Sequence, residues 1–189
     1  MIYKAEHNNI DLASQFILEG KIIIYPTDTI YGFGVDATNS VAINDLNRLK
    51  NRTSPYSIIV DSFDMLKKYS ITDQYIDNEL KKIFPGPYTA ILKKQKSNLS
   101  KLVTLNLDTV GIRIPDHSFI KNVVSNIGNP VITTSINKHG NPFINNVDKI
   151  INQYNNINIF TNMISSQSTA STIIDFSVNP YKILRKGEK

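Results

Sequence analysis

Short apolar runs rich in β-branched residues alternate along this chain with longer segments whose apolar residues recur every three or four positions. The first pattern is typical of strands and the second of helices. Residues 57–60, for example, indicate a strand, and residues 61–69 and 73–84 indicate the helices that follow. A chain that alternates in this way packs its helices on a sheet. We therefore expect an α/β fold, a single domain over residues 1–189 with helices flanking one twisted mixed sheet.

The same patterns assign most of the remaining chain. A first helix is expected between a cap at Asn9 or Asp11 and Gly20, and a second between a cap at Asn39 or Ser40 and Lys50. Further helices are expected over residues 117–127 and 147–154. Strands are expected over residues 21–25, 88–94, 109–115, 130–135, 157–160, 172–176 and 182–184. Glycines in residues 27–34 indicate a turning loop, and residues 137–142 have a loop composition.

The composition excludes several kinds of protein and site. There is no cysteine, which excludes disulfides, thiolate nucleophiles and cysteine-ligated metals. No apolar run approaches the roughly 20 residues of a membrane span, and the first residues lack the apolar centre of a secretory signal. The three histidines lack the spacing of metal ligands, and His117 is expected to cap or pack near its helix. We expect a cytoplasmic protein with no membrane segment and no metal held by its side chains.

Basic residues outnumber acidic residues by 21 to 16, which gives the chain a formal net charge of +5. Such a charge favours anionic partners, whether a nucleotide, a phosphorylated metabolite or RNA. The usual phosphate-binding loop and the dinucleotide-binding glycine pattern are both absent. Candidate ligand residues are instead polar and basic side chains in or just after expected strands, where open α/β sheets place their ligands.

Arg113 is the most informative of these residues, because it lies between Ile112 and Ile114 in an expected strand. A charged side chain on a half-buried strand must be paired or line a cavity. An arginine on the solvent face of an edge strand is the alternative.

Two pairs of polar residues show the same two-residue spacing. Lys50 and Arg52 would project to one side of an extended segment and could hold a polyphosphate together, although a solvated basic pair is equally compatible with the sequence. Ser135 and Asn137 could donate to phosphate or ribose oxygens, or form an ordinary turn.

Six segments, taken in order, resemble the motifs of the threonylcarbamoyl-AMP synthase family, the YrdC-like proteins, and especially its short single-domain bacterial members. The segments are Y-P-T-D-T-I-Y-G-F-G-V-D-A at 25–37, K-N-R at 50–52, F-P-G-P-Y-T at 84–89, V-G-I-R-I-P-D-H at 110–117, T-T-S-I-N at 133–137 and I-L-R-K-G at 183–187. The resemblance implies a twisted α/β fold with a deep basic cleft. It also implies a nucleotidyltransferase that condenses L-threonine, bicarbonate or CO2, and ATP.

In that family the carboxylate of N-carboxylated threonine attacks the α-phosphate of ATP, and pyrophosphate leaves. The product, L-threonylcarbamoyl-AMP, passes to a separate threonylcarbamoyl transferase complex that modifies tRNA beside the anticodon. The resemblance therefore implies ATP, L-threonine and bicarbonate as ligands, possible binding of tRNA, and Mg²⁺ bound with ATP through protein ligands that the sequence does not identify.

The resemblance also assigns site residues by motif. The residues implied for catalysis at the triphosphate and the reacting carbamate are Lys50, Arg52, Ser135 and Asn137. Two more are implied for ATP, namely Thr109 and Arg185. The residues implied for threonine are Thr27, Thr29, Arg113, Thr133 and Ser171.

The chain departs from the family pattern at three positions. Asp61 stands where many members have a histidine that contacts threonine, Ala170 replaces a frequent glutamate, and Thr53 replaces the proline after K-x-R.

Two other functions are alternatives to the synthase. A basic surface alone would also suit a non-catalytic RNA-binding module, but the aromatic stacking segments of single-strand readers are missing. Carbamoyl-adenylate enzymes of hydrogenase maturation carry this domain in much longer chains with zinc-finger cysteines.

Overall fold

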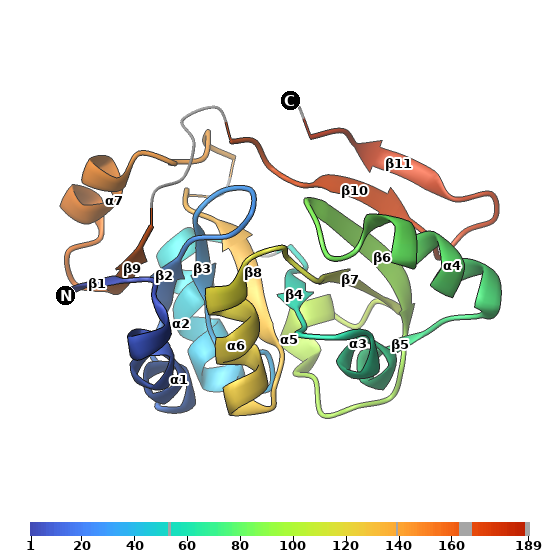
Figure 1. Cartoon of the computed structure of the whole chain (residues 1–189), viewed down its shortest axis with the longest axis horizontal. Coiled ribbons are helices and arrows are strands. Elements are labelled where there is room, and N and C mark those ends of the chain that lie inside the picture. Colours follow the sequence, from blue (N-terminus) through green and yellow to red (C-terminus); the bar gives the residue numbers. More distant parts are fainter. Residues whose placement is uncertain (53, 139, 163–167, 188–189) are drawn as a thin grey trace.

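The computed structural model describes residues 1–52, 54–138, 140–162 and 168–187, and its strands form one mixed sheet. Along the sheet the strands run in the order β1-β9-β2-β3-β8-β4-β7-β6-β10-β11, with β5 paired to β6 (Figure 1). Their bounds are β1 Ile2–Lys4, β2 Ile23–Tyr25, β3 Gly32–Gly34, β4 Ser57–Ile59, β5 Ser70–Ile71, β6 Tyr88–Lys94, β7 Thr109–Arg113, β8 Val131–Ser135, β9 Asn158–Thr161, β10 Thr172–Asp175 and β11 Lys182–Arg185.

The helices connect these strands, and α1 packs beside α6 while α2 packs beside α5. Their bounds are η1 His7–Asn9, α1 Ile10–Leu18, α2 Ser40–Lys50, α3 Phe63–Tyr69, α4 Gln74–Ile83, α5 Lys101–Thr104, α6 Ser118–Ile127 and α7 Val147–Gln153. The expected α/β fold with helices flanking a mixed sheet is therefore confirmed. In the described part of the chain, no helix has the length and apolar character needed to cross a membrane.

Local sequence signals explain why α2 begins and ends where it does. The side chain of Asn39 accepts hydrogen bonds from the backbone N–H groups of Val41 and Ala42, which satisfies donors that a helix start leaves without partners. Apolar positions such as Leu46 are buried on one face. Asn51 then ends the helix in the left-handed conformation with a φ of 49°.

The expected turning loop at residues 27–34 is wrong in its second half, because Gly32–Gly34 form β3. Position 34 requires glycine because the ring of Tyr25 lies close to its backbone, and not because the chain turns there. A Cβ added there would lie 2.5 Å from the ring of Tyr25, which passes over it from β2. Strands β2 and β3 pair antiparallel, with Tyr25 opposite Gly32 and Ile23 opposite Gly34, and the sequence pattern does not reveal this pairing.

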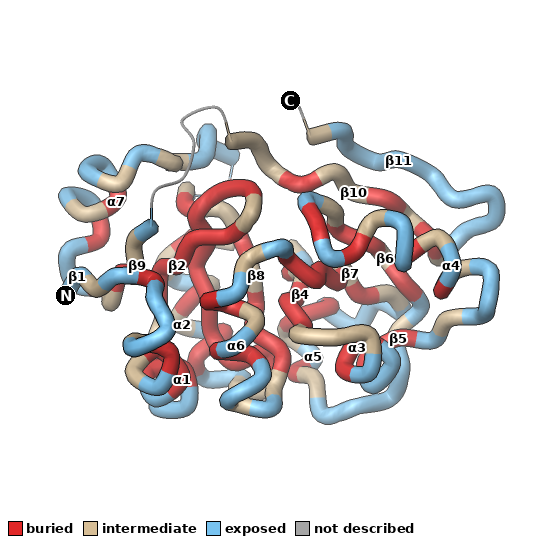
Figure 2. Tube along the Cα trace, in the orientation of Figure 1, coloured by how far each residue is buried: buried red, intermediate tan, exposed pale blue. Residues whose placement is uncertain are grey.

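The centre of the sheet is largely buried, although Ser57, Gly111 and Thr133 on one face are only partly buried. Strand β11 at the edge is exposed along its length (Figure 2). Fully buried residues such as Ile24, Ile58 and Ile132 come from neighbouring strands. Burying each such side chain contributes about 1.5–3 kcal/mol relative to leaving it in water. Strands β7 and β8, which carry Arg113, Thr133 and Ser135, therefore belong to the core, whereas Arg185 lies on the exposed strand β11.

The pairing of β4, β7 and β8 places three residues on one face of the sheet. Ser57 lies between Gly111 on one side and Thr133 on the other. A Cβ on Gly111 would lie 2.6 Å from the hydroxyl of Ser57, so the glycine leaves this face open above the backbone. Arg113, two residues beyond Gly111, projects from the same face.

Candidate functional site

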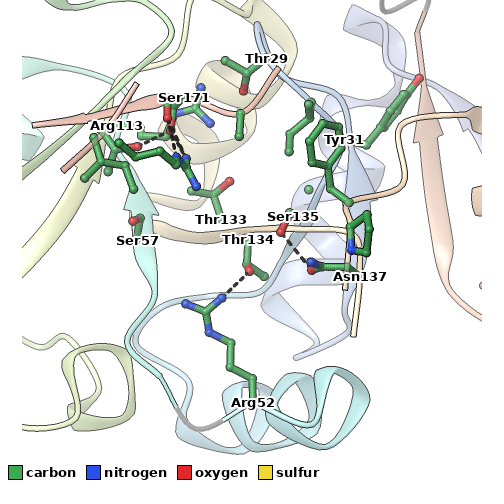
Figure 3. A pocket seen from close by; sticks show the side chains of 18 of the residues that line it. Thr29, Tyr31, Arg52, Ser57, Arg113, Thr133, Thr134, Ser135, Asn137 and Ser171 are labelled. Atoms are coloured by element: carbon green, nitrogen blue, oxygen red, sulfur yellow. Dashed lines mark hydrogen bonds between the residues drawn. The ribbon is translucent and has the colours of Figure 1, made fainter. Parts of the chain in front are cut away.

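A pocket of about 340 Å³ lies over this face of the sheet (Figure 3). Its size falls in the range of about 300–1,000 Å³ that is typical of small-molecule sites. Eight of the predicted site residues line it, although they come from segments far apart in the sequence. They are Thr29, Arg52, Arg113, Thr133, Ser135, Asn137, Ser171 and Arg185.

The other three predicted residues do not line the pocket. The buried hydroxyl of Thr27 donates to the carbonyl of Ile30 at 2.8 Å and shares a hydrogen bond with the hydroxyl of Thr29 at 2.9 Å, so it shapes the loop behind the wall. Lys50 is buried behind Asn137. Thr109 lies at the opposite end of β7 from Arg113, roughly 13 Å away along the strand.

Arg113 is buried and forms an ion pair with Asp28, with 2.8 Å between Nη2 and Oδ1. The expectation that this strand arginine is paired or lines a cavity is confirmed, since it does both. Burial lowers the pKa of Arg113, and the charge of Asp28 works in the opposite direction. Its Nε is buried with no hydrogen-bond partner among the described residues. Leaving a buried donor unpaired costs free energy, which an anionic acceptor would recover.

Lys50 is the last residue of α2, and its ammonium joins that helix to the end of β8. Nζ donates to the carbonyls of Ser135 and Asn137 at 2.5 and 2.8 Å and to Oδ1 of Asn137 at 2.8 Å. The hydroxyl of Ser135 donates to the same Oδ1 at 3.0 Å. Burial lowers the pKa of Lys50 to about 7, and the charge of Arg52 adds to this effect. The amide of Asn137 is therefore fixed with its oxygen towards Lys50.

Arg52 lies on the pocket wall without an acidic partner among the described residues. Its guanidinium donates to the hydroxyl of Thr134 at 3.1 Å and to the carbonyls of Ser54 and Pro55. It also lies 4.5 Å from the ring centroid of Tyr56, a cation–π contact. Burial lowers the pKa of Arg52.

The extended arrangement expected for Lys50 and Arg52 is wrong. Asn51 between them takes the left-handed conformation that ends α2, so the chain turns and the two cations separate. Lys50 contacts the end of β8, whereas Arg52 reaches the pocket beside Thr134. The sequence spacing could not show this because it does not specify the backbone conformation at residue 51.

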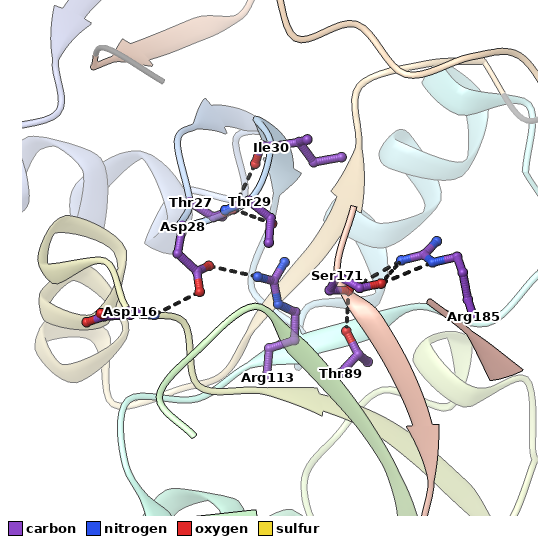
Figure 4. A network of polar contacts seen from close by, with 9 residues as sticks. All are labelled: Thr27, Asp28, Thr29, Ile30, Thr89, Arg113, Asp116, Ser171 and Arg185. Atoms are coloured by element: carbon purple, nitrogen blue, oxygen red, sulfur yellow. Dashed lines mark hydrogen bonds and ion pairs between the residues drawn. The ribbon is translucent and has the colours of Figure 1, made fainter. Parts of the chain in front are cut away.

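Arg185 and Ser171 form the far wall of the pocket (Figure 4). Nε and Nη2 of Arg185 donate to the carbonyl of Ser171 at 3.1 and 2.7 Å. The hydroxyl of Ser171 lies 2.8 Å from that of Thr89 on β6. Burial lowers the pKa of Arg185, and the charge of Arg113 lowers it further, so the two guanidiniums act on one another across the pocket.

Several lining residues were missed by the sequence analysis. Thr89 ends the F-P-G-P-Y-T segment, so the motif contained a signal for it. Thr134 lies in the T-T-S-I-N segment but was given no role, yet its hydroxyl accepts a hydrogen bond from Arg52. Ser57 and Phe143 carried no sequence signal, since only the packing brings them to the pocket.

Two residues singled out by sequence lie away from the pocket lining. Asp61 accepts a hydrogen bond of 2.6 Å from the hydroxyl of Ser62. His117 directly precedes α6 as expected, but its side chain makes no capping hydrogen bond. Burial lowers the pKa of His117. The departure at residue 53 lies outside the described residues.

The chemistry of the lining suits an anion that also offers several hydrogen-bonding oxygens. It holds three guanidiniums with hydroxyls and amides between them, and residues 1–52, 54–138, 140–162 and 168–187 contribute no carboxylate to it. Guanidinium groups bind carboxylates and phosphates through paired hydrogen bonds. That the cleft is basic as a whole stays a prediction.

The described residues do not fit a metal ion held by the protein itself. They contain no group of three or more His, Asp or Glu side chains that could act together as ligands. We therefore assign no step to a metal bound by side chains. Mg²⁺ carried in with ATP stays a prediction from the resemblance.

Comparisons with known proteins show which family the chain resembles. The Sua5/YciO/YrdC family profile, described as "Telomere recombination", matches residues 15–187. Threonylcarbamoyl-AMP synthase of Vibrio vulnificus (strain YJ016) is 30% identical over 151 residues, which are 77% of this chain and 81% of that protein.

Solved structures show the same fold. The crystal structure of P. abyssi Sua5 complexed with L-threonine matches with a TM-score of 0.90 and 28% identity, covering 99% of this chain but only 57% of that one. E. coli YciO matches with a TM-score of 0.88 and 21% identity over 99% of this chain and 95% of that one, which shows the fold alone. The profile match extends over nearly the whole chain, and the chain therefore belongs to the Sua5/YciO/YrdC family.

Proposed function

We propose that this protein is a threonylcarbamoyl-AMP synthase, which converts L-threonine, bicarbonate or CO2, and ATP into L-threonylcarbamoyl-AMP and pyrophosphate. The observation that carries the proposal is the convergence of Arg52, Arg113 and Arg185 on one pocket that Ser135 and Asn137 also line. The match to the family profile and the similarity to a threonylcarbamoyl-AMP synthase support the same activity. Supply of the product for tRNA modification by a separate transferase complex belongs to this proposal.

Arg113 binds the carboxylate of threonine in this proposal. Its unpartnered Nε and the second N–H of Nη2 can donate to the two oxygens of one carboxylate. Thr29, Thr133 and Ser171 line the same pocket and supply hydroxyls for the rest of the amino acid. The structure with L-threonine of a relative, P. abyssi Sua5, supports an amino acid in this fold.

Arg52 and Arg185 bind the nucleotide phosphates, with Ser135 and Asn137 on the reacting carbamate and the α-phosphate. A carbamate oxygen forms a bond to the α-phosphorus while the bond from that phosphorus to the bridging oxygen breaks, so pyrophosphate leaves with the electron pair. Such a transfer depends on positioning and on neutralising charge. Lys50 holds the amide of Asn137 from behind and would reach a phosphate only by exchanging one of its three acceptors.

Thr27 supports the threonine-binding loop through Thr29 in this proposal. Thr109 has no role in it, because Thr109 lies at the far end of β7.

The test mixes the protein with ATP, L-threonine and bicarbonate in the absence of RNA and measures pyrophosphate. Release that requires both threonine and bicarbonate supports the synthase. A matched control for loss of a cation is Arg48→Ala, since Arg48 is an exposed arginine on α2 that pairs with Asp45. It should release pyrophosphate at the wild-type rate. No release above background, together with tight binding of tRNA, would favour the RNA-binding module.

A further inference from the structure

The carboxylate of Asp28 uses both of its oxygens to hold the pocket's buried arginine (Figure 4). Oδ1 accepts from Nη2 of Arg113 at 2.8 Å, and Oδ2 accepts from the backbone N–H of Asp116 at 3.1 Å. The side chains of Asp28 and Arg113 are only 9% and 6% exposed. Asp28 does not itself line the pocket. Asp28 therefore contacts Arg113 from outside the pocket lining.

These contacts also join segments that are far apart in the sequence. Asp28 lies in the connection between β2 and β3, whereas Asp116 follows the end of β7. A carboxylate fixed at both oxygens cannot rotate without breaking one of the two bonds, so the guanidinium it holds is fixed as well. Nε of Arg113 stays without a partner among the described residues.

We propose that Asp28 is a positioning residue, which orients the guanidinium of Arg113 so that its remaining N–H groups receive the carboxylate of the amino-acid substrate. The inference rests on the proposed function, since it concerns the same pocket. Asp28 acts through Arg113 and does not touch the substrate. It also neutralises Arg113, so the wall that binds one carboxylate has less excess charge than the wall at Arg52.

The decisive variant is Asp28→Asn, which keeps the size of the side chain. An asparagine amide has one accepting oxygen and one donating nitrogen, so it can accept from Arg113 or from the N–H of Asp116 but not from both. We expect the KM for L-threonine to rise about tenfold, while the KM for ATP changes less than about twofold. A merely structural defect would not separate the two KM values in this way.

The matched control is Asp36→Asn. Asp36 is also a buried carboxylate, and it accepts from the N–H and hydroxyl of Thr38 and from the amide of Asn129, away from the pocket. It should lower thermal stability without changing the ratio of the two KM values. An equal rise in the threonine KM of Asp28→Asn and Asp36→Asn would overturn the inference.

Three further measurements of the threonine KM test the role of Asp28. If Asp28→Asn does not fold, Asp28→Glu preserves the charge but displaces the carboxylate, and an unchanged threonine KM in that variant would overturn the positioning role. A lower threonine KM in Asp28→Asn would show that Asp28 competes with the substrate for Arg113, which also overturns it. In an Arg113→Lys background, Asp28→Asn should add little to the threonine KM, because both changes act through one group.

The wild-type protein separates this inference from the proposed function. If the wild type releases no pyrophosphate with threonine, bicarbonate and ATP, the proposed function has failed. If the wild type is active and Asp28→Asn keeps its threonine KM, only the role of Asp28 has failed.

Discussion

The two cationic walls of the pocket are held in different ways. Arg113 is fully buried and paired with the carboxylate of Asp28. Arg52 is held by two backbone carbonyls and the hydroxyl of Thr134, with no acidic partner among the described residues. The guanidinium of Arg113 is therefore held in one orientation and most of its charge is neutralised, whereas Arg52 keeps its charge.

This difference matches the two ligands of the proposed reaction. An amino-acid carboxylate carries one charge and is recognised by the geometry of two hydrogen bonds. A triphosphate carries several charges, and its binding depends on positive charge that no protein carboxylate has already neutralised. Orientation therefore matters more at Arg113, and net charge matters more at Arg52.

Arg52→Ala is expected to have the largest effect on activity. We expect turnover to fall by about a hundredfold to a thousandfold, because a donor to the developing phosphate charge is lost. The Tm should shift by only a few degrees, since the hydrogen bonds lost are to neutral groups. The measurement pairs pyrophosphate release with calorimetry. Comparable losses of turnover and of folded protein would assign Arg52 a structural role.

Arg113→Lys tests the role of geometry on the other wall. Lysine preserves the charge but cannot donate two parallel hydrogen bonds to one carboxylate. The KM for threonine should rise about tenfold to a hundredfold, with a smaller effect on the KM for ATP. Steady-state kinetics with each substrate varied in turn provides the measurement, and a threonine KM equal to that of the wild type would remove the bidentate contact.

The lowered pKa of Lys50 predicts that the folding stability depends on pH. Its pKa is lowered to about 7 in the folded protein, mainly by burial, from 10.5 in an exposed lysine. Between these values the unfolded chain holds a proton that the folded chain has released, so raising the pH disfavours unfolding.

The free energy of unfolding should therefore rise with pH across this window, by at most about 1.4 kcal/mol per pH unit from this group. Urea denaturation at pH 7, 8 and 9 provides the measurement. Lys50→Met should be less stable overall but show a shallower slope, because it lacks the titrating group. Identical slopes in the two proteins would contradict the prediction.

Thr109→Val tests whether the site extends to the far end of β7, and it should have the smallest effect on activity. Thr109 lies at the far end of β7 from Arg113 and pairs with Lys93 in the sheet. Valine fits a strand well, so both KM values and turnover should stay within about twofold of the wild type. A large rise in the KM for ATP would show that the nucleotide extends along β7 beyond Gly111.

The sequence analysis predicted most elements because their patterns are local. Strand β6 has the predicted bounds, and α6 and α7 differ from prediction by a single residue at one end. The two-residue strand β5 and the one-turn helix α5 were missed, because such short elements leave no periodicity to detect. Strand β3 was missed because its glycines indicated a turn.

The sequence alone showed the alternation of strands and helices, the six ordered motifs, and an arginine in a strand for which pairing or a cavity was expected and an exposed edge was the alternative. Only the tertiary structure decided that Asp28 is the partner of Arg113 and that Lys50 is buried against the end of β8. The physical reason is that helix and strand patterns arise between residues a few positions apart. These two contacts each join residues 85 positions apart, and they exist only once the sheet has brought its strands together.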